Sequence, residues 1–231
     1  MNLQNLPKLR VILTGATGMV GEGVLHESLN APEVEKVLLL NRRVSGIQHP
    51  KVTEVVHQDL FDLTAIEHEL TGYNACFFCL GTTSVGKSKE EYYRTTYELT
   101  MQVATTLSRL NGSMTFSYIS GAGTNSSEQG GSNWSRVKGK VENDLKLLPF
   151  EKVYNFRPGF LQPTPGLKNT LGFYKYINWL FPVLRPLMPG MLGTLKELGL
   201  GMIHATAYGY PKDVLEVKDI REAATSSKSI R

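Results

Sequence analysis

The sequence predicts an α/β protein with a doubly wound parallel sheet and a small helical cap at its C-terminal end. Three observations support this class. Short apolar segments alternate with segments of helical periodicity over residues 9–160, a glycine-rich turn follows the first strand, and prolines become frequent beyond residue 162. Strands that alternate with helices at this spacing form parallel βαβ units, so we expect helices on both faces of the sheet.

Length and composition fit this class. With 231 residues, of which 41% are hydrophobic, the chain can bury the core of one α/β domain with a small appendage. We predict a main domain at residues 1–162 and a small C-terminal region at 163–231 that packs on it. The formal net charge is +4, but acidic and basic residues are interspersed. This pattern favours a mixed-charge surface and no nucleic-acid partner.

Two features bear on the cellular compartment. The first ten residues, MNLQNLPKLR, lack the apolar segment of a signal peptide, so a cytoplasmic location is expected. Cys76 and Cys79 lie in the strand-like segment ACFFCL, where residues three apart point to opposite faces. We therefore expect two core cysteines and no disulfide.

The five histidines are scattered along the sequence and suggest no metal site.

The first predicted strand, 9–13, runs into the turn TGATGMVG at residues 14–21 and then a helix. Gly15 would allow a sharp turn, Gly18 would let the backbone approach a pyrophosphate, and Gly21 would let the helix pack closely on the strand. The first N–H groups of the helix would face the phosphates. The alternative is a turn that uses glycine for its geometry alone. The cofactor-binding residues expected here are Gly15, Thr17, Gly18, Met19, Val20 and Gly21.

The second predicted strand, 35–41, is followed by Arg42 and Arg43. In a dinucleotide-binding fold this position meets the adenosine ribose, where an acidic residue accepts a hydrogen bond from the 2′-hydroxyl of NAD. Arginines instead suit a 2′-phosphate, with a charge-assisted hydrogen bond of about 1.5 to 3 kcal/mol. The sequence therefore predicts NADP rather than NAD as cofactor. Arginines that are only solvated in a loop are the alternative.

The remaining elements follow in order. We expect a third strand at 51–57, a short helix capped by Asp62 at 62–70, a fourth strand at 75–80 and a long helix from Ser88 to 110. A fifth strand at 113–119, a helix at 134–148 and a sixth strand at 152–156 complete the sheet. Near the C-terminus we expect a helix at 194–207 with a capping box at Thr194, a short strand at 214–217 and a helical turn capped by Asp219.

Residues 163–193 carry five prolines around an apolar, aromatic-rich segment. Lys175, Asn178 and Arg185, together with internal prolines, argue against a membrane span. We expect this region to be a substrate cap or a homodimer face, with contact to a membrane surface as an alternative.

Several motifs in a fixed order suggest a family. They are TGATGMVG, the arginine pair, Gln58-Asp59-Leu60, CLGTT at 79–83, Ser120, VKGKVE at 137–142 and RPG at 157–159. Over residues 9–162 the chain resembles the short-chain dehydrogenase/reductase superfamily, in the atypical epimerase-like branch that includes the NmrA-like and Tat-interacting-protein-like proteins. The resemblance implies a Rossmann fold, a nicotinamide dinucleotide and a small-molecule substrate.

The resemblance also implies roles for individual residues. Ser120 would hydrogen-bond the substrate carbonyl or hydroxyl, and Arg42 with Arg43 would bind the 2′-phosphate. The other cofactor contacts that it implies are Asp59 and Leu60 at the adenine, Gly81 and Thr82 beside the ribose, Lys138 at the nicotinamide ribose, and Pro158 and Gly159 at the nicotinamide carboxamide. The candidate catalytic residues are Ser120, Trp134 and Lys138.

One departure from the family pattern concerns the proton donor. The family has a tyrosine four residues before the lysine, and this sequence has Trp134 there. An indole N–H does not release its proton near neutral pH, so Trp134 cannot be the general acid or base.

Three interpretations remain open. The first is an NADP(H)-dependent oxidoreductase or epimerase-like enzyme, whose proton is handled by Ser120 through water, by the substrate, or by a group of the cap such as Tyr174, Tyr176 or His204. The second is a catalytically silent NADP(H)-binding sensor or regulator. The third is an interaction scaffold that has lost nucleotide binding.

Overall fold

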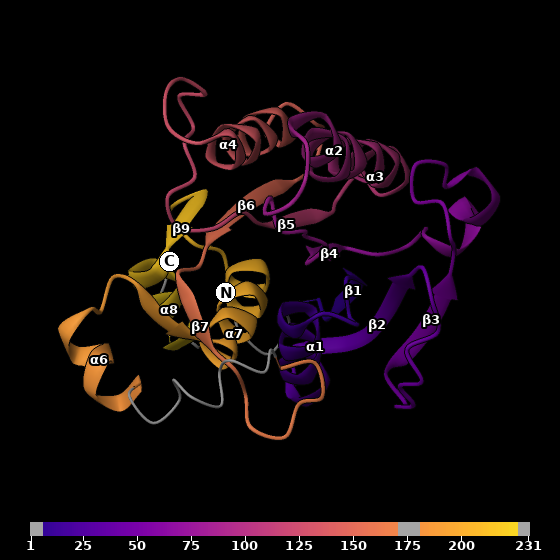
Figure 1. Ribbon diagram of the computed structural model, residues 1–231. Helices are drawn as coiled ribbons and strands as arrows, with labels where there is room; N and C mark the ends of the chain where they lie inside the picture. The colour runs from indigo at the N-terminus through magenta and orange to yellow at the C-terminus, as the bar shows by residue number, and fades with distance from the viewer. Residues whose placement is uncertain (1–6, 171–180, 226–231) are drawn as a thin grey trace.

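The computed structural model describes residues 7–170 and 181–225. Its main sheet has seven parallel strands in the order β3-β2-β1-β4-β5-β6-β9 (Figure 1). This order confirms the predicted doubly wound sheet. The strands are β1 (Leu9–Thr14), β2 (Val34–Asn41), β3 (Val52–Val56), β4 (Ala75–Phe78), β5 (Thr115–Ile119), β6 (Lys152–Arg157) and β9 (Val214–Glu216).

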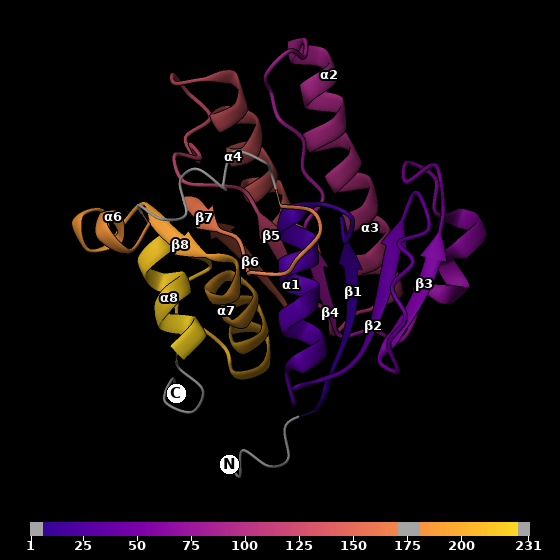
Figure 2. The same cartoon turned by 60° about the horizontal axis from the view of Figure 1, so that its bottom comes forward.

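Helices cover both faces of this sheet. α1 (Met19–Asn30), α7 (Leu195–Tyr208) and α8 (Val217–Thr225) lie on one face, and α2 (Lys89–Tyr93), α3 (Leu99–Leu110) and α4 (Asn133–Leu145) lie on the other (Figure 1 and Figure 2). Neighbouring strand residues enter opposite cores: Leu13 and Phe77 belong to the α1 side, and Ile12 and Phe78 to the α3 side. Because the inner strands are buried on both faces, β1, β2 and β4 contain continuous apolar segments, whereas the edge strand β3 is largely half-buried or exposed.

The long helix predicted from Ser88 to residue 110 is present, with an irregular middle. Ser88 Oγ accepts a hydrogen bond from the Glu91 N–H at 3.0 Å and caps α2. The Glu91 carboxylate forms a salt bridge with Lys87. Between α2 and α3 the backbone is π-helical over η3 (Arg94–Glu98). The sequence pattern did not indicate this local widening, which is rare within helices.

Two predicted caps lie at other positions. The segment after β3 is a 3-10 helix, η2 (Thr64–Glu69), whose N-cap is Leu63; Asp62 Oδ1 accepts a hydrogen bond from the Thr64 N–H at 3.0 Å. Asp219 lies inside the first turn of α8, where its Oδ2 accepts from the Glu216 N–H at 3.1 Å. Aspartate can bond N–H groups at several sequence offsets, so its presence does not fix the first helical residue.

The C-terminal region contains elements that were not predicted. β7 (Phe160–Gln162) and β8 (Leu192–Thr194) form a separate two-stranded parallel sheet, and α6 (Phe181–Leu187) precedes β8. α7 begins with the predicted capping box of Thr194 and Glu197, and β9 extends the edge of the main sheet. In the part of the chain described here, no helix is long and apolar enough to cross a membrane. The division of the chain at residue 162 stays a prediction.

Candidate functional site

The glycine-rich turn lies where the strand order reverses, because β1 has β2 on one side and β4 on the other. Ligands of open parallel sheets bind at such a point, beyond the carboxyl ends of the strands. Gly15 has a φ of +75°, and a Cβ on it would lie 2.8 Å from the Cys79 carbonyl oxygen. A Cβ on Gly21 would lie 2.1 Å from the Gly15 carbonyl oxygen. Both positions therefore exclude a larger residue.

Gly18 begins α1. It is the N-cap of the helix, and its N–H donates to the Gly15 carbonyl at 3.0 Å. The next N–H groups, from Met19 to Gly21, belong to the first turn, which has no partners within the helix itself. Thr17, which precedes Gly18, is exposed at the open side of the turn. This local geometry fits a bound pyrophosphate, since it combines a positive dipole end with small residues.

The residues that follow β4 are hydrogen-bonded to Thr14, which directly precedes Gly15. Thr14 is fully buried, and its Oγ1 accepts hydrogen bonds from the N–H groups of Cys79 at 3.2 Å and Leu80 at 3.4 Å. Cys76 and Cys79 are free thiols, as predicted, and burial raises the pKa of both. The cysteines are therefore packing residues, Cys76 buried within β4 and Cys79 half-buried just after it, and not a redox pair.

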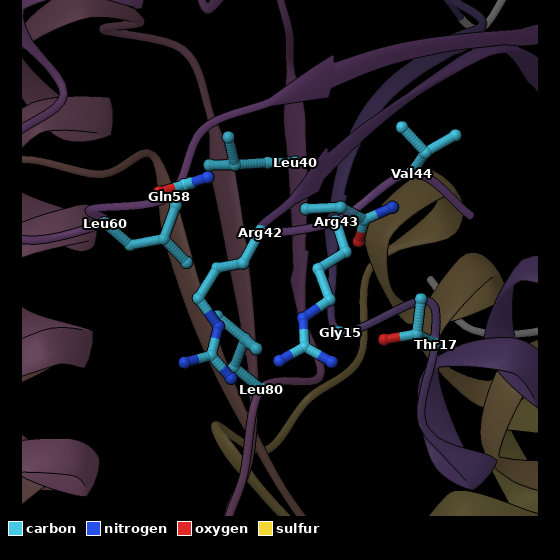
Figure 3. Close-up of a pocket in the computed structure, with 10 residues that line it drawn as sticks. Gly15, Thr17, Leu40, Arg42, Arg43, Val44, Gln58, Leu60 and Leu80 are labelled. Atoms are coloured by element: carbon cyan, nitrogen blue, oxygen red, sulfur yellow. The ribbon is translucent and has the colours of Figure 1, made fainter.

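A pocket of about 760 Å³ opens beside the turn. Arg42 and Arg43 extend into it from the end of β2, Arg42 toward Leu80 and Arg43 toward Gly15 (Figure 3). Both arginines are exposed, and within residues 7–170 and 181–225 neither forms a salt bridge. The lining residues are Gly15, Thr17, Leu40, Asn41, Arg42, Arg43, Val44, Gln58, Leu60 and Leu80.

The carboxylate of Glu54 is hydrogen-bonded to the two residues that flank the segment 42–44. Glu54 Oε1, on β3, accepts from Asn41 Nδ2 at 2.8 Å and from the Ser45 N–H at 2.9 Å. Partial burial acts to raise the pKa of Glu54, but the hydrogen bonds from Ser45 and Asn41 outweigh it and hold that pKa below its ordinary value. Glu54 is therefore an anion at neutral pH.

The adenine side differs in detail from the expectation. Leu60 lines the pocket, whereas the Asp59 carboxylate accepts a hydrogen bond from the Phe61 N–H at 2.9 Å and shapes the turn. Gly81 and Thr82 follow the lining residue Leu80 and are not among the lining residues themselves. Sequence reasoning missed the lining residues Leu40, Val44, Gln58 and Leu80; their signal was their place at or just after the strand ends.

A second pocket, of about 250 Å³, lies at Trp134. The indole forms one wall and packs toward the turn after β5: its Cη2 would lie 3.5 Å from a Cβ on Gly123. The residues lining this pocket come from the segment after β4 and from the starts of α2 and α4: Ser84, Lys87, Ser88, Lys89, Tyr92, Ser132, Asn133 and Trp134. Trp134 thus lines a cavity one helical turn from Lys138.

Lys138 projects from α4 toward the end of β5. Its Nζ donates to the Ile119 carbonyl at 3.1 Å and lies 5.5 Å from the centre of the Tyr118 ring. Burial lowers the pKa of Lys138 to about 8, although the charge of Glu142 acts in the opposite direction. Lys138 therefore loses its charge at a lower pH than an ordinary lysine.

Ser120 belongs to a buried polar network that the sequence did not reveal. Its Oγ donates to Glu142 Oε1 at 2.5 Å. The Glu142 carboxylate is fully buried and is bound by Arg157, whose Nε lies 2.9 Å from Oε1. Arg157 also reaches Glu216 at 3.0 Å and Ser126 at 2.5 Å. The Phe156 carbonyl, at 3.2 Å, is a second acceptor for the Ser120 hydroxyl. Since the Ser120 proton has acceptors within this network, the shorter being Glu142, Ser120 Oγ can offer a substrate only its acceptor lone pairs.

The remaining candidates are placed as follows. Gly159 lets β7 approach β8, because a Cβ on it would lie 2.1 Å from the Met191 carbonyl oxygen. The Pro158 carbonyl accepts a hydrogen bond from the Ala122 N–H at 2.8 Å.

His204, on α7, is buried against α8, with its Nδ1 3.1 Å from the Ala223 carbonyl oxygen, so it is not a proton donor at either pocket. Tyr174 and Tyr176 lie outside the described residues. Among those described, no group of three His, Cys, Asp or Glu side chains could hold a metal ion.

The start of α1 is hydrogen-bonded to the C-terminal region through Glu22. Glu22, in the first turn of α1, accepts from the backbone N–H groups of Lys168 at 2.8 Å and Asn169 at 2.7 Å. The segment that leads out of β7 is thereby attached to α1 next to Gly21, and Figure 2 shows it crossing that helix.

Fold and site together define a nicotinamide-dinucleotide-binding Rossmann protein of the short-chain dehydrogenase/reductase type. The chain belongs to the NAD dependent epimerase/dehydratase family, which matches residues 11–134. Protein FMP52-1, mitochondrial, from Scheffersomyces stipitis is 28% identical over 74% of this chain and 77% of its own length. Protein HTATIP2 from Rattus norvegicus is 28% identical over 65% of this chain and 62% of its own length.

Solved structures share the fold. The Bordetella bronchiseptica enzyme WbmG in complex with NAD has a TM-score of 0.65 at 13% identity, over 94% of this chain and 77% of WbmG. L-Sorbose reductase from Gluconobacter frateurii, complexed with NADPH and L-sorbose, has a TM-score of 0.61 at 14% identity, over 90% of this chain and 93% of the reductase. One neighbour binds NAD and the other NADPH, so the likeness does not distinguish the two cofactors.

The comparisons correct the expected cytoplasmic location. The relatives from Scheffersomyces stipitis and Saccharomyces cerevisiae are both named as mitochondrial proteins. The expectation rested on the absence of a secretory signal at residues 1–10, and that absence does not separate the cytoplasm from a mitochondrion.

Proposed function

We propose that this protein binds NADP(H) in the pocket beside the glycine turn and acts as an oxidoreductase or epimerase-like enzyme on a small carbonyl or hydroxyl substrate. The observation that supports it is the pair of arginines, Arg42 and Arg43, which line the same pocket as Gly15 and form no salt bridge within the described residues. In the proposal, the glycine turn takes the pyrophosphate and the guanidinium groups take the 2′-phosphate.

The substrate would occupy the pocket at Trp134. A bound nicotinamide dinucleotide would supply hydride chemistry, and the chain would orient the substrate and manage its proton. Ser120 Oγ would accept a hydrogen bond from the substrate hydroxyl, because its own proton is donated to Glu142. Lys138 would hold a ribose hydroxyl. Trp134 would cover the reacting face without exchanging a proton.

Titration with NADPH and NADH, followed by nicotinamide fluorescence, tests the cofactor assignment. We expect NADPH to bind about tenfold to a hundredfold more tightly, since a charge-assisted hydrogen bond contributes about 1.5 to 3 kcal/mol. Arg42→Ala and Arg43→Ala should each reduce this preference. Arg10→Ala is the matched control, because Arg10 is exposed at the opposite end of β1. Equal affinity for the two nucleotides in the unchanged protein would contradict the NADP assignment.

A catalytically silent NADP(H)-binding protein is the second candidate. The observation in its favour is that the tyrosine position holds Trp134 while the Ser120 proton is committed to Glu142. Turnover of NADPH with a panel of small aldehydes and ketones, compared with Ser120→Ala, separates the two candidates. Activity that Ser120→Ala reduces supports the enzyme, and tight binding without turnover supports the silent protein. Absence of nucleotide binding would favour the scaffold.

Two further assignments belong to this proposal. Residues 163–231 would form a cap beside the site, although those that the structure describes line neither the cofactor pocket nor the pocket at Trp134. The names of the fungal relatives favour a mitochondrial location. Fractionation of cells that express the tagged full chain tests the location: recovery with mitochondria is expected, and recovery elsewhere would contradict it. Size-exclusion chromatography with light scattering tests for a homodimer.

A further inference from the structure

The segment that carries the two arginines is short and exposed. Arg42, Arg43 and Val44 are all exposed, and they connect the buried residue Asn41 to Ser45. Long arginine side chains on such a segment lose conformational entropy when they bind a ligand. If the backbone of the segment is already fixed at both ends, less conformational entropy is lost on binding, and the protein binds its ligand more tightly.

Both ends of this segment are fixed by one oxygen atom. Glu54 Oε1 accepts from Asn41 Nδ2 at 2.8 Å and from the Ser45 N–H at 2.9 Å. The backbone adds one more attachment on the strand side, because the His57 N–H donates to the Asn41 carbonyl at 2.8 Å. Glu54 itself is held in register by the parallel pairing of β3 with β2. Three residues lie between the two partners of Glu54, and two of them are the arginines Arg42 and Arg43.

We infer that Glu54 is a positioning residue for cofactor choice: it closes the segment 41–45 so that Arg42 and Arg43 are presented together to a 2′-phosphate. The inference rests on the proposed function, because it explains how the proposed NADP site is built. Glu54 carries a negative charge close to that site, which by itself would disfavour a phosphate. Its benefit is therefore geometric, and the two effects can be separated by substitution.

Glu54→Gln and Glu54→Ala form the matched pair. Glutamine keeps an oxygen that can accept from both Asn41 and Ser45, while it removes the charge. Alanine removes the acceptor and leaves both donors without it. We expect Glu54→Gln to keep or increase the preference for a 2′-phosphate, and Glu54→Ala to reduce the preference by about tenfold or more, the loss expected for one charge-assisted contact. Affinity for NADH should change little in either variant.

The measurement is isothermal titration of the full chain with NADPH and NADH, and with adenosine 2′,5′-bisphosphate and AMP, which carry no nicotinamide. Glu35→Ala, an exposed glutamate at the other end of β2, is the control for the substitution itself. Thermal melting of each variant shows that it is folded, and retained NADH binding shows that the rest of the site is intact.

The outcomes separate this inference from the proposed function. If the unchanged protein does not prefer the 2′-phosphate, the NADP assignment fails and the inference fails with it. If the preference is present and Glu54→Ala retains it, the inference alone is overturned. If both variants weaken NADH rather than NADPH, Glu54 binds a ribose hydroxyl directly, which also overturns its positioning role.

Discussion

Replacing Gly21 by alanine tests the packing of α1 on the glycine turn. The new Cβ would lie 2.1 Å from the Gly15 carbonyl oxygen and 2.5 Å from its carbon, and both are backbone atoms that no rotamer can move. Reaching the 3.0 Å below which Cβ contacts are essentially absent requires a displacement of about 0.9 Å. Overpacking of this kind costs about 1 to 3 kcal/mol. The start of α1 must therefore move away from the pocket.

Two readouts follow from that displacement. At about 2 to 4 °C per kcal/mol for a chain of this size, the Tm should fall by several degrees. NADPH affinity should fall at least about tenfold, since a shifted helix start loses one or more hydrogen bonds to charged phosphates. Gly112→Ala is the control, because a Cβ there meets nothing within 4 Å. A Gly21→Ala protein with unchanged Tm and unchanged NADPH affinity would refute the reasoning.

Three further predictions concern the second pocket and the C-terminal region. NADPH affinity should fall as the pH rises through about 8, because Lys138 loses its charge there. NADPH titrations one pH unit below and one above this value should give different affinities, and Lys138→Met should remove that difference. Glu142→Ala leaves Arg157 without its buried partner and should cost about 3 to 5 kcal/mol in urea unfolding, whereas Glu216→Ala, on the exposed partner, should cost about 1 kcal/mol or less. Thr194→Ala removes the N-cap of α7 and should lower the unfolding free energy by about 1 kcal/mol, and an unchanged urea midpoint would contradict it.

Most of the main sheet could be predicted from the sequence because its strands are buried on both faces. In β2, residues 37–40 are continuously apolar and buried, and the twelve-residue helix α1 separates β2 from its neighbour β1. The small sheet could not be predicted in this way. β7 and β8 have three residues each, and their pairing depends on Gly159, whose missing Cβ allows the close approach to Met191. A three-residue strand has too few positions to show a period.

The candidate site was predictable where its residues are contiguous in the chain. The glycine turn and the arginine pair are local patterns, and the structure brings them to one pocket. The contacts of Ser120 and Glu54 were not predictable, because their partners lie on other elements. Glu142 offered one signal: it is a carboxylate four residues after Lys138, on a helix whose apolar residues are buried. A charge at such a position requires a partner, but the sequence does not say which one.

The bond between Glu22 and the N–H groups of Lys168 and Asn169 has a consequence for the proposed cap. Glu22 lies one residue after Gly21, so any shift of the first turn of α1 would be passed directly to the segment beyond β7. That segment belongs to the proposed cap. A nucleotide bound at the glycine turn would therefore bear directly on the position of this cap.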